Sequence, residues 1–192
     1  MRKRFGIDID GTITRPDALL PFINKEFNLS LTIQDITQYE LTPFVNVPGE
    51  VFSTWFKKTE PLIYAESPIA SGAKDALTKW KDEHELIIIS ARSKSLLDVT
   101  EAWFKKQDLA AHHIELVGSH DKVAAAIQHK VDIFFEDKHD NAVAIAEHCR
   151  IPVLLFNAPY NQDPVPENVV RVKDWHEAKH WVGHWLKHKE KQ

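Results

Sequence analysis

Apolar residues change their spacing along the chain, and this change predicts how the chain is organised. From residue 71 onward, short apolar runs of strand length alternate with stretches in which apolar residues recur at helical spacing. The run 86–90 reads Leu-Ile-Ile-Ile-Ser, a continuous apolar pattern that is typical of a strand covered on both faces. Strands that alternate with helices predict an α/β fold with a parallel sheet and right-handed crossovers.

The individual elements follow from the same alternation. We expect strands at residues 5–10, 86–90, 114–117, 131–135 and 153–156. We expect helices at residues 71–83, 94–107, 121–130, 141–149 and about 174–189. Residues 15–68 lack strand-like runs, show helical spacing and are interrupted by prolines at 16, 21, 43, 48, 61 and 68. We interpret residues 15–68 as a small helical insert in a core made of residues 1–14 and 69–192.

Composition and charge narrow the class of protein. The 192 residues suffice for one sizeable core and a small insert. The 24 basic and 28 acidic residues give a net charge of -4, which does not favour a nucleic acid polymer or an anionic membrane as partner. The single cysteine, Cys149, suits a reducing compartment. No apolar run would span a bilayer, and Asp8 and Asp10 interrupt any leader, so we expect a cytoplasmic protein.

Polar side chains stand where three of the apolar runs end. Asp8 and Asp10 close the first, Ser90 closes the second, and Glu136 and Asp137 follow 131–135. Ligands of parallel sheets bind outside the carboxyl ends of the strands. These side chains are therefore expected to share one site.

The two acids after the first strand indicate a cation. Asp8 lies among apolar residues, and burying a carboxylate is costly unless it is paired or bound to a metal. Side chains two residues apart in an extended chain point to the same side, so Asp8 and Asp10 would repel each other without a cation between them. We therefore predict a Mg²⁺ site here. The alternative is a strand end with an Asp that caps a following helix.

The same residues suit phosphoryl transfer. Asp8 is a candidate nucleophile, and Asp10 is placed to act as general acid and then as general base. The Ser90 hydroxyl and the backbone N–H of Ala91, which we expect to open the next helix, suit phosphate oxygens. Lys122, near a predicted helix start, would offset the charge of the phosphate. Arg92 is predicted either to hold substrate or to pair with an acid; the sequence favours neither.

In these motifs the chain resembles the haloacid dehalogenase (HAD) superfamily. The matching pieces occur in the family's order: Asp-Ile-Asp-Gly-Thr at 8–12, Ile-Ile-Ile-Ser at 87–90, Lys122, and Phe-Phe-Glu-Asp at 134–137. The resemblance implies a Rossmann-like three-layer sandwich and a helical cap inserted after the first strand. It also implies Mg²⁺ held by Asp8, the backbone carbonyl of Asp10 and an acid of the fourth motif. The substrate phosphate is then expected to contact Gly11, Thr12, Ser90, Ala91, Arg92 and Lys122.

Two details make the resemblance narrower. Asp10 matches the phosphatases of the family, and residues 136–141 are similar to those of the 5'(3')-deoxyribonucleotidase branch. The chain departs from that branch with Glu136, where an Asp is usual. We predict that Asp137 is the direct metal ligand and that Glu136 acts through water. The resemblance implies a phosphomonoester hydrolase acting on nucleoside monophosphates.

Other interpretations stay open. A phosphatase or phosphotransferase for sugar phosphates would share these motifs, and so would a non-catalytic binding protein on the same fold. The sequence also leaves open whether two copies form a homodimer. Phe22 and Phe44 are candidates to line the mouth of the site. The row of histidines in the last helix fits either a zinc site or a flank of the apolar stripe: His176, His180, His184 and His188.

Overall fold

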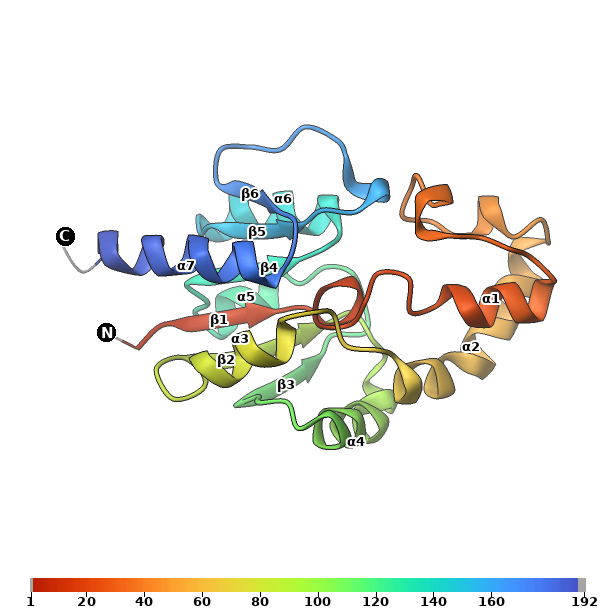
Figure 1. The fold of residues 1–192 in the computed structure, drawn as a ribbon, viewed down its shortest axis with the longest axis horizontal. Coiled ribbons are helices and arrows are strands. Elements are labelled where there is room, and N and C mark those ends of the chain that lie inside the picture. Colours follow the sequence, from red (N-terminus) through yellow and green to blue (C-terminus); the bar gives the residue numbers. More distant parts are fainter. Residues whose placement is uncertain (1, 190–192) are drawn as a thin grey trace.

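The core of the protein is a six-stranded sheet in which every neighbouring pair of strands is parallel. The computed structural model describes residues 2–189, and the strand order is β3-β2-β1-β4-β5-β6 (Figure 1). The predicted α/β class and parallel sheet are confirmed. The strands are β1 (Arg4–Ile7), β2 (Glu85–Ser90), β3 (His113–Leu116), β4 (Ile133–Glu136), β5 (Val153–Phe156) and β6 (Val169–Val172).

Helices cover both faces of this sheet and make the three layers. One face packs against α3 (Ala73–Trp80), α4 (Leu97–Gln107) and α7 (Trp175–Lys189). The other packs against α5 (Val123–Gln128) and α6 (His139–Cys149). Within β2, Ile88 lies in the first apolar cluster and Ile89 in the second, because successive side chains point to opposite faces. This explains the uninterrupted apolar run.

A helical segment, residues 15–68, lies at one end of the sheet (Figure 1). It contains α1 (Leu20–Phe27) and α2 (Gly49–Glu66), and it has its own apolar cluster around Leu20, Ile23, Ile36 and Val45. The chain enters and leaves it side by side through an antiparallel bridge between Thr14 and Ile69. None of the helices within residues 2–189 has the length and apolar character needed to cross a membrane.

The first strand ends earlier than predicted. β1 stops at Ile7, and residues 9–13 form a tight turn, so Asp8 and Asp10 do not share one extended segment. Gly11 has a φ of 76°, and a Cβ atom there would lie 2.1 Å from Oδ2 of Asp137. Only glycine allows this close approach. The indole Nε1 of Trp175, at the start of α7, fixes the turn by donating to the carbonyl of Thr12 at 2.9 Å.

The structure differs from the sequence predictions in two further places. Residues 91–93 form a loop, and the helical turns begin at Lys94, so Ala91 does not open a helix. The sixth strand, β6, was not predicted. It lies at the edge of the sheet and carries the polar Arg171, so its four residues lack the apolar run that marks the central strands.

Candidate active site

The carboxyl edge of the sheet brings the predicted residues together. Asp8 follows β1, Ser90 ends β2, Asp137 follows β4, and Lys122 precedes α5. This edge and the helical segment enclose a cavity of about 510 Å³. Its lining includes most of the predicted site residues, namely Asp8, Asp10, Gly11, Ser90, Ala91, Arg92, Lys122 and Asp137. Thr12 and Glu136 are buried behind them and are not part of the lining.

Lys122 joins two carboxylates in the interior. Its Nζ lies 2.6 Å from Oδ1 of Asp8 and 2.8 Å from Oε2 of Glu136. All three side chains are buried. Burial alone would lower the pKa of Lys122, but the two carboxylates raise it above its usual value. Lys122 is therefore a fixed cation beside Asp8.

The Lys122→Met variant is expected to lose about 3–5 kcal/mol of unfolding free energy, because the change leaves two buried carboxylates without their cation. Urea unfolding of the wild type and of Lys122→Met would measure this loss. Lys187→Met is the matched control, since Lys187 is exposed on α7 and its loss should change stability by less than about 0.5 kcal/mol. Equal unfolding midpoints for the two variants would contradict the expectation.

Three buried acids form a cluster suited to a metal ion. One carboxylate oxygen each from Asp8, Glu136 and Asp137 lies within 4.8 Å of the others. Burial raises the pKa of Asp8 to about 7, against the effect of Lys122. Burial and the neighbouring acids also raise the pKa of Asp137 well above its usual value. Three carboxylates thus face a single lysine, which cannot by itself stabilise all three in their ionised form, and their oxygen atoms suit a hard cation.

The two adjacent acids have different surroundings. Glu136 accepts from Lys122, from the backbone N–H of Lys138 at 3.1 Å and from Asn141 Nδ2 at 3.5 Å. Asp137 accepts at Oδ2 from the Tyr160 hydroxyl at 2.6 Å, whereas its Oδ1 is buried without a hydrogen-bond partner. A buried oxygen without a partner is costly, so Oδ1 of Asp137 is the atom that most needs a ligand.

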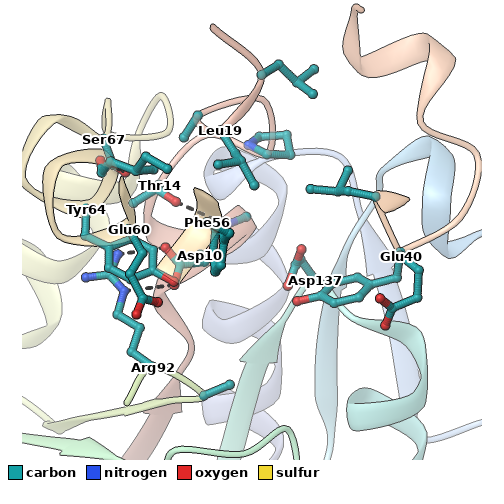
Figure 2. A pocket seen from close by; sticks show the side chains of 18 of the residues that line it. Asp10, Thr14, Leu19, Glu40, Phe56, Glu60, Tyr64, Ser67, Arg92 and Asp137 are labelled. Atoms are coloured by element: carbon teal, nitrogen blue, oxygen red, sulfur yellow. Dashed lines mark hydrogen bonds and ion pairs between the residues drawn. The ribbon is translucent and has the colours of Figure 1, made fainter. Parts of the chain in front are cut away.

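Arg92 binds Asp10 instead of leaving its guanidinium free. Its Nε and Nη2 donate to the two carboxylate oxygens of Asp10 at 2.9 and 2.7 Å. Nη1 donates to Thr100 of α4 at 3.1 Å, and the guanidinium lies 3.8 Å from the ring centre of Tyr64. Figure 2 shows Arg92 reaching from the core toward Asp10, beside Tyr64 and Glu60 of α2. Of the two predicted roles for Arg92, the structure shows the pairing with an acid.

The sequence interpretation missed several aromatic residues of the site. Tyr160 lies in the turn Pro159–Asn161 after β5, so the rule that ligands bind beyond the carboxyl ends of strands indicates this loop but not the individual residue. Tyr39 packs edge-on against Tyr160, with ring centres 5.8 Å apart. No periodic signal singles out Tyr39 or Tyr64 from the other aromatics of the helical segment. Phe22 and Phe44 were the wrong candidates, because the cavity is lined by Phe52 and Phe56 of α2 instead.

Solved structures share this fold. The chain matches a haloacid dehalogenase-like protein of unknown function from Agrobacterium tumefaciens with a TM-score of 0.68, at 13% identity over 97% of this chain and 100% of that chain. It also matches the "putative HAD-hydrolase YfnB" from Bacillus subtilis, a structure bound to magnesium, with a TM-score of 0.63, at 12% identity over 95% of this chain and 100% of that chain. The chain therefore has the fold of the HAD-type hydrolases, and the carboxyl edge of its sheet carries the acidic cluster described above.

Two proteins with higher sequence identity to this chain show which family it belongs to. The chain is 53% identical over 186 residues to "Putative nucleotidase BH1399" of Halalkalibacterium halodurans, covering 97% of this chain and 95% of that protein. It is 49% identical over 179 residues to "Putative nucleotidase YqfW" of Bacillus subtilis, covering 93% of each. No family model matches the chain. The chain belongs to the family of these two relatives, and its fold is that of the HAD-type hydrolases.

Proposed function

We propose that the protein is a Mg²⁺-dependent 5'-nucleotidase that hydrolyses nucleoside monophosphates, with deoxyribonucleotides preferred, through a phosphorylated Asp8. The observation that carries this proposal is the buried carboxylate of Asp8. It lines the cavity, is held by Lys122, and belongs to the acidic cluster in which Oδ1 of Asp137 has no hydrogen-bond partner. A carboxylate in this setting can act as a nucleophile toward phosphorus.

The acidic cluster fits a Mg²⁺ ion, because Mg²⁺ prefers a few carboxylates together with water and substrate phosphate. Asp8, Asp137 and the backbone carbonyl of Asp10 would hold the ion, and Glu136 would support it through water. When bound, Mg²⁺ would neutralise charge on the phosphate oxygens. The unpartnered Oδ1 of Asp137 is the feature of this structure that favours such an ion.

The chain's own residues then divide the reaction into two steps. A carboxylate oxygen of Asp8 forms a bond to phosphorus while the bond from phosphorus to the ester oxygen breaks. Asp10, in its protonated form, gives its proton to that leaving oxygen. Asp10 next takes a proton from water, whose oxygen attacks phosphorus, and the bond to Asp8 breaks to release phosphate. Lys122 and the Ser90 hydroxyl would bind the phosphate oxygens in both steps.

The nucleotide preference comes from the far wall of the cavity. Phe52 and Phe56 of α2 line it, and flat aromatic rings suit the faces of nucleobases. The helical segment, residues 15–68, would thus act as a cap that contacts the leaving nucleoside while the sheet edge binds its phosphate. The names of the two curated relatives support the same substrate class.

A panel of phosphate esters, assayed for released phosphate with and without Mg²⁺, tests this function. We expect turnover of nucleoside monophosphates that requires Mg²⁺ and is lost with a chelator. Strong turnover of a sugar phosphate, with a flat response to every nucleotide, would overturn the substrate class. Absence of Mg²⁺-dependent turnover for the whole panel would overturn the enzymatic proposal and favour a binding protein.

A further inference from the structure

A second group of side chains that could bind a metal lies outside the cavity, on the edge strand β3 and at the end of α5. His113 and Glu115 belong to the edge strand β3, and His129 directly follows α5. One ligand atom from each of these three residues lies within 4.8 Å of the other two. None of the three lines the cavity. We refer to them as the edge cluster.

The fold itself brings the edge cluster together. In the sheet, His113 is paired with Ile87 and Glu115 with Ile89. Both isoleucines lie in the apolar cluster beneath α5 and α6, so His113 and Glu115 point to that face of the sheet. His129 is the C-terminal cap of α5, which places its ring over the same face. Regular elements therefore supply all three ligands.

The contacts within the edge cluster are close. Nε2 of His129 lies 2.5 Å from Oε2 of Glu115, and the ring centres of His113 and His129 are 4.8 Å apart. Glu115 and His129 are partly buried, with 26% and 19% of their side chains exposed, and His113 is exposed. The cluster is thus held in place and is open to solvent on one side.

We propose that the edge cluster binds a Zn²⁺ ion through the two imidazoles and the carboxylate. Two His and one acid are a recurrent ligand set for zinc, and water completes the four positions. Mg²⁺ would not compete, because it prefers oxygen ligands to imidazole nitrogen. The bound ion would tie α5 to the edge strand. Because Lys122 precedes α5 and His129 follows it, the short helix that places the active-site lysine would then be fixed at both ends.

The proposal is tested by titrating Zn²⁺ into the full chain in excess Mg²⁺ and measuring the heat of binding by calorimetry. Excess Mg²⁺ competes with Zn²⁺ for the acidic cluster, and the variants identify the zinc binding that depends on the edge cluster. The variants are His113→Asn and Glu115→Gln. His184→Asn is the matched control, because it removes one imidazole from another close pair, His180 and His184 on α7, whose ring nitrogens lie 3.1 Å apart.

We expect wild type and His184→Asn to bind one equivalent of Zn²⁺ with the same affinity. In His113→Asn and Glu115→Gln, the affinity for this Zn²⁺ should be at least tenfold lower. At a hundredfold excess of Zn²⁺ over its Kd, the melting temperature of the wild type should rise by roughly 5 °C or more. The rise should persist in His184→Asn and be lost in His113→Asn. Equal zinc binding by wild type and His113→Asn, or a melting temperature that zinc does not raise, would overturn the proposal. The cluster would then be only an ion pair of His129 with Glu115.

Discussion

Asp8→Asn is expected to lower the hydrolysis of phosphate esters by roughly 10⁴-fold or more, with the fold intact. The amide has nearly the same shape as the carboxylate, but it cannot form the acyl phosphate. Lys122 keeps Glu136 as a partner at 2.8 Å, so its charge stays paired in the variant. Released phosphate at saturating Mg²⁺ measures the loss.

Loss of activity in Asp8→Asn could also arise from weaker metal binding, because Asp8 is a proposed metal ligand. A second measurement must therefore detect the covalent step directly. Wild-type protein that is mixed with substrate and quenched in acid should carry a phosphoryl group on the peptide containing Asp8. Asp108→Asn is the matched control, because Asp108 is an exposed carboxylate in an ion pair with Lys74 and lies outside the cavity. Near-normal turnover of Asp8→Asn at saturating Mg²⁺ would exclude Asp8 as the nucleophile.

Asp10→Asn is expected to slow turnover by about 10²- to 10⁴-fold, the range found for loss of a general acid or base. Both proposed steps need a proton transfer at residue 10, so formation and hydrolysis of the phosphorylated Asp8 should both become slower. With an activated ester such as a nitrophenyl phosphate, whose leaving group needs no proton, the first step should recover. Phosphorylated protein should then accumulate, and quenched samples measure its amount.

The contact between Asp10 and Arg92 makes this result informative. Arg92 donates to both oxygens of Asp10, an arrangement that only the ionised carboxylate accepts in full. Asp10 is therefore held at both carboxylate oxygens by Arg92. To act as an acid it must take up a proton and give up one of the two Arg92 contacts. If Asp10→Asn hydrolyses nucleoside monophosphates as fast as wild type, a group other than Asp10 transfers the proton to the leaving oxygen.

Much of the fold could be predicted because its signals are local. The apolar run of β2 and the strand β5 have the predicted residues almost without change. The edge strand β6 was missed because a strand with one neighbour and a polar residue carries little hydrophobic pattern. The early end of β1 was missed because it depends on the close approach of Gly11 to Asp137, and these residues are distant in sequence.

The site shows the same difference between local and long-range information. Asp8, Ser90, Lys122 and Asp137 could be grouped because parallel strands end at one edge of a sheet. The partner of Arg92 could not be predicted, since Asp10 and Arg92 come from separate loops and α2 supplies the ring of Tyr64. The division of roles between Glu136 and Asp137 remains a prediction. Their different hydrogen bonds support it.

The bond from Trp175 to the carbonyl of Thr12 links the beginning of the chain to its last helix. During synthesis on the ribosome, the loop with both aspartates emerges early, but the indole that fixes it is translated more than 160 positions later. A chain that ends before Trp175 thus lacks the hydrogen bond that supports this loop. Activity should arise only after α7 has been synthesised, and products that terminate before α7 should be inactive.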